Sequence, residues 1–259
     1  MSFFKSLGSR LKDKGDERGP HASASPSQFK YQRLDASKRE IRVMTVNSWN
    51  AITRTYEHRP MEATDLHITL WTQSLDEKPN YVPLSYAWSK DKPKKKVYVD
   101  TGDWKKLQER KMKPPEGRQT LEIPEDVYGF LRFKVNSAIL GRRDPNVGWA
   151  GAAVLWIDQL CINQQDPKEA AVQIGYMDEI YFRPKQTLIW MGFGDAGIAL
   201  TFAALPPEHC PIEDPLNPRY WKALRALLGR TWWSRTWIIQ EALLSNISAQ
   251  MVCGNSGSS

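Results

Sequence analysis

One carboxylate, Glu241, lies in an otherwise apolar helical segment, which makes it the leading candidate for chemistry. The segment is RTWWSRTWIIQEALL, residues 230–244, and it places Glu241 one helical turn after Trp237. A carboxylate beside such an apolar face is partly desolvated, and it can act as an acid, a base or a stabiliser of positive charge. The alternative is a structural ion pair with Arg235 or Arg230, because such pairs also recruit carboxylates into apolar surroundings.

A second polar group follows an apolar run at residues 153–157. That run ends on Asp158, which either meets a ligand or anchors the next loop through backbone N–H groups. In this loop Asn163 and Gln164 offer donors and acceptors to a ligand or to the loop's own backbone. Cys161 has no histidine that would suit a nucleophilic pair, so we interpret it as a small buried apolar residue.

A strand–helix–strand unit is predicted to position these residues. The run at 153–157 is typical of a strand buried on both faces, apolar spacings of three and four at 170–181 predict a helix, and 187–191 predicts a second buried strand. Such units are almost always right-handed and parallel. Ligands of open parallel sheets bind at the carboxyl ends of the strands, so Asp158 and its loop are expected at the working edge.

The rest of the chain predicts further strands and helices around this unit. Strands are expected at 41–46, 63–73, 80–88, 97–99 and 251–253, and helices from Pro124, at 198–205, at 221–228 and after a capping Ser234. The alternation in 63–73 indicates a half-buried strand, Pro83 places 80–88 at a strand start or a sheet edge, and the lysine-rich 89–96 predicts a hairpin tip before 97–99. We predict an α/β fold with a mostly parallel sheet flanked by helices, plus an extra β-hairpin and helical insertions.

Composition excludes several classes of protein. The 259 residues are 41% apolar and 11% aromatic, which is typical of a globular protein. Of the net charge of +7, the first 44 residues contribute ten Lys or Arg against five Asp or Glu, so a basic nucleic-acid-binding face is not expected in the folded part. The three cysteines lack metal-ligand or CxxC spacing, which favours a reducing, cytoplasmic location without a zinc site or disulfide framework. No phosphate-binding glycine motif occurs, and no metal or resident cofactor is expected.

The eleven tryptophans could stack on nucleic-acid bases, but most lie in apolar runs. Trp156 and Trp190 fall in predicted strands, and Trp221, Trp233 and Trp237 in predicted helices. We therefore expect these tryptophans in the core and no nucleic-acid partner.

The chain divides into a flexible basic N-terminal arm at 1–30, a folded domain at 31–254 and a flexible tail at 255–259. Within the arm, MSFFKSLGSRLKDKG places apolar and lysine side chains on opposite sides of a short helix. This pattern suits weak contact with an anionic membrane surface, and the alternative is a solvated, disordered arm.

Four segments together resemble the fungal heterokaryon incompatibility (HET) domain. They are YVPLSYAWS at 81–89, LWIDQLCINQQDPKEAAVQIGYMDEIY at 155–181, TLIWMG at 187–192 and RTWWSRTWIIQEALL at 230–244. Their order and spacing also match, and WIDxLCINQ and RxWxxQE are highly specific to that family. Ser89 departs from the glycine that usually follows the SYxW motif, which affects only the local turn.

The resemblance implies a function in fungal programmed cell death during non-self recognition. HET domains look distantly related to TIR domains, which implies a flavodoxin-like sheet and, by similarity, cleavage of the nicotinamide–ribose bond of NAD+. Trp237 to Glu241 match the Trp-x-x-x-Glu segment of such enzymes, so the resemblance implies Glu241 as the catalytic carboxylate. It also implies self-association, and an NLR-like receptor or another incompatibility protein as partner.

The other candidate site residues are expected to bind the substrate or to shape the site. Trp88 or Trp237 could stack on a ring of the substrate, Ser85 and Tyr86 could bind a phosphate or ribose, Asp158 could order its loop and Asn163 could bind the substrate. In this interpretation NAD+ is a substrate rather than a cofactor, and one carboxylate suffices because the nicotinamide leaves as a neutral group.

The competing hypothesis is a non-catalytic module that recruits partners through its tryptophan-rich surface. The position of Glu241 discriminates between the two hypotheses. A Glu241 open to a cleft beside Ser85, Trp88 and Asp158 favours the enzyme, whereas a Glu241 closed in an ion pair beneath other side chains favours the module.

Overall fold

The computed structural model describes residues 27–50, 55–56, 64–88, 93–101, 119–139, 154–194, 218–244 and 249–255. The strands are β1 (Ser27–Gln28), β2 (Glu40–Asn50), β3 (Thr55–Tyr56), β4 (Thr64–Ser74), β5 (Val82–Tyr86), β6 (Lys94–Thr101), β7 (Gln119–Pro124), β8 (Leu155–Trp156), β9 (Thr187–Gly194) and β10 (Ala249–Asn255). The α-helices are α2 (Glu125–Ile139), α3 (Asp158–Cys161), α4 (Pro167–Ile174), α5 (Met177–Phe182), α7 (Pro218–Leu228) and α8 (Ile238–Leu243), and the 3₁₀ helices are η1 (Ala36–Lys38), η3 (Leu75–Glu77) and η4 (Thr231–Ser234). Residues 1–26 of the predicted arm at 1–30 and the predicted helix at 198–205 lie outside these residues. Within 27–30, β1 pairs with β7 and Phe29 is buried, so this end of the predicted arm packs on the folded domain.

The strands of the described residues form one mixed sheet in the order β1-β7-β6-β4-β2-β8-β5-β9-β10, with β3 paired to β2. Five of its strand pairs are parallel and four are antiparallel. The α/β class is confirmed, but the prediction of a mostly parallel sheet is wrong. β2 and β4 pair antiparallel over 11 residues, and β3 lies in the short connection between them.

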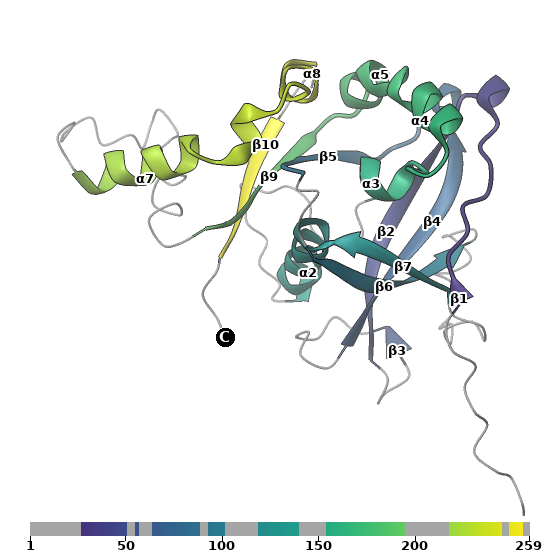
Figure 1. Ribbon diagram of the computed structural model, residues 1–259, viewed down its shortest axis with the longest axis horizontal. Helices are drawn as coiled ribbons and strands as arrows, with labels where there is room; N and C mark the ends of the chain where they lie inside the picture. The colour runs from purple at the N-terminus through teal and green to yellow at the C-terminus, as the bar shows by residue number, and fades with distance from the viewer. Residues whose placement is uncertain are drawn as a thin grey trace, which may run out of the picture.

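The parallel half of the sheet consists of β8, β5, β9 and β10. The predicted strand–helix–strand unit is present as β8, α3 to α5 and β9, and its two strands are parallel because both pair in parallel with β5, which lies between them. In Figure 1, α5 and α8 lie above β5 and β9, and α2 lies below them. Helices thus cover both faces of the parallel half.

Residues on β9 alternate between these two layers. Ile189 and Met191 pack in a cluster with Trp232 at the α7 and α8 side. Trp190, between them, contacts the ring of Phe130 on α2. This alternation follows the period of two in a strand and explains why 187–191 is buried on both faces.

Two predictions about the other half of the sheet are wrong. Strands β5 and β6 do not form a hairpin, because both edges of β5 are taken by β8 and β9, while β6 pairs with β4 and β7. The central part of β4, residues 66–70, is buried at every position rather than at alternate ones. Pro83 is the second residue of β5, which confirms a strand start in a strand that is not at an edge.

Proline, glycine and side-chain hydrogen bonds mark the ends of several helices. α2 follows Pro124 as predicted. The predicted helix at 170–181 is divided into α4 and α5 at Gly175, and Asp166 caps α4 by accepting from the N–H groups of Lys168 and Glu169. Ser234 does not cap α8 as predicted. It is the last residue of η4, its hydroxyl donates to the carbonyl of Thr231, and Trp237 occupies the N-cap position of α8.

Tryptophan side chains lie both in the core and at the surface. Trp156 and Trp190 are buried, as predicted for these strand positions, and Trp232 of η4 is buried as well. Trp221 and Trp237 are 53% and 44% exposed, so the prediction of core use is wrong for these helical positions, and Trp233 is 37% exposed. No helix within the described ranges is long and apolar enough to cross a membrane.

Candidate functional site

Glu241 lies at the centre of a buried polar cluster, which we call the Glu241 cluster and which consists of Ser85, Trp232, Arg235 and Glu241. The Arg235 guanidinium donates to both carboxylate oxygens of Glu241, from Nη1 to Oε2 at 2.9 Å and from Nη2 to Oε1 at 2.9 Å. The Ser85 hydroxyl also donates to Oε2, and the indole N–H of Trp232 donates to the Ser85 oxygen at 2.7 Å. Only 1% of Glu241 is exposed.

Three elements assemble this cluster. Ser85 projects from β5, where it pairs in register with Ile189 of β9. η4 places Trp232 in the small core beside Ile189, and the chain then turns so that Arg235 precedes α8. The N–H of Glu241 donates to the carbonyl of Trp237 at 3.0 Å, which forms the first turn of α8 where this helix contacts β5. The predicted helical spacing of Trp237 and Glu241 is therefore correct.

The Glu241 carboxylate is closed in this conformation. A bidentate Arg–carboxylate pair is among the strongest polar contacts, and it neutralises a charge that burial would otherwise penalise. The structural alternative, an ion pair with Arg235, is confirmed as geometry. The open cleft expected for the enzyme is not present in this conformation, and the closed ion pair is the arrangement expected for the non-catalytic module.

Asp158 forms a second polar group next to the Glu241 cluster. It is the first residue of α3, and its Oδ1 accepts from the hydroxyl of Tyr86 at 3.0 Å and from the N–H of Gln159 at 2.7 Å. Tyr86 follows Ser85 on β5, so adjacent residues of one strand reach the two carboxylates. The indole N–H of Trp88 donates to the Gln159 side chain, and Trp88 remains 43% exposed at this rim.

Burial and neighbouring charges shape the electrostatics of this region. Burial raises the pKa of Asp158, the hydroxyl of Tyr86 opposes this, and the charge of Glu241 raises the pKa further. Burial also raises the pKa of Tyr86 and of Tyr181 well above the usual range for tyrosine. The negative charges of Glu241 and Asp158 add to the pKa of Tyr181, whose hydroxyl donates to the carbonyl of Leu84.

The structure does not bring Asn163 into this group. Its side-chain oxygen accepts from the N–H of Gln165, and its own N–H donates to Glu169 at 2.7 Å. Both contacts shape the loop after α3. Trp237 contributes its backbone carbonyl to α8, while its ring is 44% exposed. Cys161 is fully buried, and burial raises the pKa of its thiol to about 12, which agrees with an inert apolar role.

A buried ion pair supports the loop that carries Asp158. Arg42 of β2 binds Glu169 of α4 at 2.5 and 2.9 Å and donates to the carbonyl of Cys161 at 3.0 Å. The hydroxyl of Tyr31 donates to the carbonyl of Leu160 at 3.1 Å. β2 therefore ties down both ends of the segment between α3 and α4.

Sequence reasoning missed Trp232, Gln159 and Tyr181 as parts of this region. Trp232 looked like one more apolar residue, and only its indole N–H, which needs an acceptor when buried, could have suggested a polar contact. Gln159 lies between Asp158 and Leu160 in WIDxLCINQ, and nothing in its spacing indicates a contact with Trp88.

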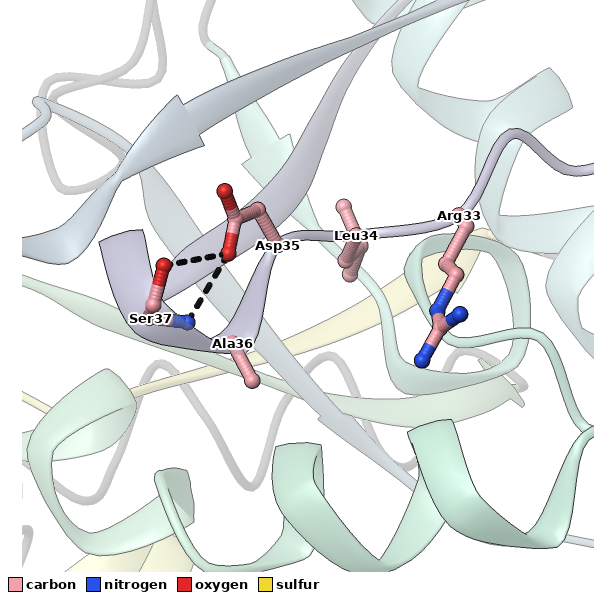
Figure 2. A pocket seen from close by; sticks show the side chains of 5 residues that line it. All are labelled: Arg33, Leu34, Asp35, Ala36 and Ser37. Atoms are coloured by element: carbon pink, nitrogen blue, oxygen red, sulfur yellow. Dashed lines mark hydrogen bonds between the residues drawn. The ribbon is translucent and has the colours of Figure 1, made fainter.

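A cavity elsewhere does not coincide with this site. A pocket of about 410 Å³ is lined by Arg33, Leu34, Asp35, Ala36 and Ser37. Figure 2 shows that Asp35 turns back onto the N–H and hydroxyl of Ser37, so its carboxylate already has partners within the segment. No residue of the Glu241 cluster lines this pocket. Among the residues that the structure describes, no group of three or more His, Cys, Asp or Glu side chains could hold a metal ion.

Comparisons with known proteins agree on one family. The family model described as heterokaryon incompatibility protein (HET) matches residues 81–241, which include the whole Glu241 cluster. "Heterokaryon incompatibility protein 6, OR allele" of Neurospora crassa is 26% identical over 130 residues, covering 49% of this chain and 16% of that protein. The matched region thus spans a small part of the relative's length. No solved structure matches the chain.

Proposed function

The chain belongs to the heterokaryon incompatibility (HET) family, and we propose that it acts in heterokaryon incompatibility as a domain that cleaves NAD+. The observation that carries the proposal is the buried Glu241 carboxylate, which binds Ser85 near the carboxyl end of β5 in the parallel half of the sheet. The name of the Neurospora crassa relative supports the same biological process for this chain.

The order of the parallel strands supports a flavodoxin-like, TIR-like core. Counted along the chain, β5, β8, β9 and β10 are the first to fourth strands of this half, and their order across the sheet is second, first, third, fourth. This is how the flavodoxin-like order begins, and such sheets bind ligands at the carboxyl ends of the first and third strands. These strands are β5 and β9, which α8 contacts and overlies (Figure 1), and Ser85 of β5 binds Glu241 of α8.

Cleavage of the nicotinamide–ribose bond requires mainly a negative charge beside the ribose. When the nicotinamide–ribose bond breaks, the electron pair leaves with the ring nitrogen, the nicotinamide becomes neutral and positive charge develops on the ribose. A carboxylate at the ribose stabilises that charge, and low surrounding polarity strengthens the effect. Glu241 has the burial for this role.

The arrangement described here is proposed to be the closed state of the site. Arg235 and Ser85 occupy the oxygens of Glu241 that a ribose would need, so activity requires an exchange of these contacts. We propose that self-association drives the exchange, because an interface that favours the open form shifts the population toward it. An NLR-like receptor or another incompatibility protein would act at the same step.

A non-catalytic interaction module is the second candidate. The specific observation in its favour is the closed Glu241 together with apolar side chains left exposed on the neighbouring helices, including 44% of Trp237 and 77% of Leu243. In this case Arg235 and Glu241 stabilise α8, and the exposed side chains bind a partner.

Expression in fungal cells separates the two functions. We expect the wild-type chain to lower cellular NAD+ before cells die, whereas Glu241→Gln keeps NAD+ at the level of an empty vector. Cell death with unchanged NAD+ contradicts the enzyme and supports the module. Immunoblotting of both proteins controls for their abundance.

A further inference from the structure

Asp158 differs from Glu241 in how its oxygens are used. Oδ1 accepts from the Tyr86 hydroxyl and the Gln159 N–H, which orient the carboxyl group. Oδ2 accepts no hydrogen bond from any residue that the structure describes, and no cation is paired with the group there. All three donors of the Glu241 carboxylate, by contrast, come from Ser85 and Arg235.

The two carboxylates lie close enough to influence one another. The negative charge of Glu241 raises the pKa of Asp158, and the positive charge of Arg235 lowers it. The charges of Glu241, Asp158 and Arg235 also act on the pKa of Tyr181. Asp158 begins α3 and is separated from β8 by Ile157 alone, and its partner Tyr86 ends β5. The Asp158 carboxylate therefore lies at the carboxyl ends of two adjacent parallel strands. This is the edge at which ligands of such sheets bind.

We propose that Asp158 is a second catalytic carboxylate of this site and removes a proton from the water molecule that attacks the ribose. The inference rests on the proposed cleavage of NAD+. In this step the bond between the anomeric carbon and the nicotinamide nitrogen breaks, and its electron pair leaves with neutral nicotinamide. The water oxygen bonds to the same carbon, its proton passes to Oδ2 of Asp158 and then to solvent, and ADP-ribose is the product.

The different environments of Glu241 and Asp158 suit them to different roles in the proposed reaction. Glu241 is buried, so it can stabilise positive charge on the ribose once Arg235 and Ser85 release its oxygens. A general base needs an accessible oxygen and a pKa near the working pH, since a strongly acidic carboxyl binds protons too weakly to assist the attack of water. Burial raises the pKa of Asp158 in this direction, and Tyr86 keeps the carboxyl group oriented.

Azide provides the test, because this anion attacks carbon without losing a proton and needs no base. Purified wild type, Asp158→Asn and Glu241→Gln are given NAD+ at high protein concentration, with and without sodium azide, and nicotinamide, ADP-ribose and ADP-ribosyl azide are resolved by chromatography. Asn keeps an oxygen for Tyr86 and Gln159. Asp178→Asn is the matched control, because Asp178 also accepts the next N–H, from Glu179 at 2.8 Å, at the start of a helix.

We expect Asp158→Asn to hydrolyse NAD+ about 100-fold more slowly than wild type, as is usual for loss of a general base. Azide should restore most of its nicotinamide release, whereas Glu241→Gln should stay inactive with azide. In addition, wild-type hydrolysis should fall as the pH is lowered through the pKa of Asp158, and the residual rate of Asp158→Asn should lack this fall.

Each other outcome overturns a distinct claim. Unchanged hydrolysis in Asp158→Asn, or a loss that azide does not reverse while the wild type is active, contradicts the base and leaves NAD+ cleavage standing. An inactive wild type with both nucleophiles overturns the cleavage itself and the base with it. Circular dichroism verifies that each variant is folded.

Discussion

Arg235 binds both oxygens of the Glu241 carboxylate, with each of its terminal nitrogens 2.9 Å from one oxygen. The two residues are six positions apart, so the pair spans the turn between η4 and α8. Glu241 is 1% exposed and the Arg235 side chain 18%. The contact thus fixes α8 on the sheet and at the same time covers the carboxylate on which the proposed chemistry depends.

Removing the arginine should be costly because it leaves a buried charge without its partner. We expect Arg235→Ala to lower the free energy of unfolding by about 3–5 kcal/mol, measured by urea denaturation followed by tryptophan fluorescence. Lys95→Ala is the control, because Lys95 and its partner Glu125 are far more exposed, and it should lose no more than about 1 kcal/mol. Equal losses of unfolding free energy in both variants would show that the Arg235–Glu241 pair stabilises the fold no more than an exposed pair does.

Ser85 links the carboxylate to the neighbouring indole. Ser85→Ala removes a donor to Glu241 and leaves the indole N–H of Trp232 without its acceptor, so we expect a loss of about 1–3 kcal/mol. Thermal unfolding of the purified variant measures it. Ser234→Ala removes an exposed hydroxyl bonded to a local carbonyl and should change stability by less than about 0.5 kcal/mol. If Ser85→Ala unfolds at the same temperature as wild type, the contact with Trp232 is contradicted.

Much of the parallel half was predictable from local pattern. The apolar runs that became β8 and β9 and the helical spacing in the segments of α5 and α8 were all visible, since continuous apolar runs and periods of three to four need no knowledge of the partner. The pairing of Arg235 with Glu241 was foreseen as one of two alternatives. Deciding between them required the burial of the carboxylate, which only the packing of α8 on β5 and β9 determines.

The pairing of distant strands was not predictable from the same signals. β5 inserts between β8 and β9, although these two are connected through α3 to α5, because strand order depends on contacts between segments far apart in the chain. The hairpin expected between β5 and β6 failed for the same reason. The exposed Trp221 and Trp237 show that an apolar spacing on a helix does not reveal whether a partner covers it.

Asp158 should make stability depend on pH. Its pKa in the folded protein is raised, mainly by burial, so the folded state binds this proton more tightly than the unfolded chain does. The group therefore favours folding below its unfolded pKa, and this contribution is lost as the pH rises through its folded pKa. Asp158→Asn does not titrate, so its stability relative to wild type should increase as the pH rises above about 4, the pKa of Asp in the unfolded chain, in urea denaturation. A difference independent of pH would contradict the raised pKa.

The Arg42–Glu169 pair should depend on the shape of the arginine and not on its charge alone. Lysine cannot bind both Glu169 oxygens and the carbonyl of Cys161 together, so we expect Arg42→Lys to lose about 2 kcal/mol or more. Hydrogen exchange should also rise in the loop between α3 and α4, which this contact ties to β2. Arg39→Lys is the matched control, because Arg39 also binds acidic side chains, Asp76 and Glu179, but is 33% exposed. Unchanged exchange in that loop would show that Arg42 does not support it.

The most direct measurement of the central claim is nicotinamide release from NAD+ by the purified chain over a series of protein concentrations. The account predicts that wild type releases nicotinamide more than proportionally as the concentration rises, because self-association opens the site. Glu241→Gln should release none, and Glu122→Gln, which alters an exposed carboxylate, should match the wild type. Equal release by wild type and Glu241→Gln, or none from a folded wild type at any concentration, would contradict the claim that Glu241 cleaves NAD+.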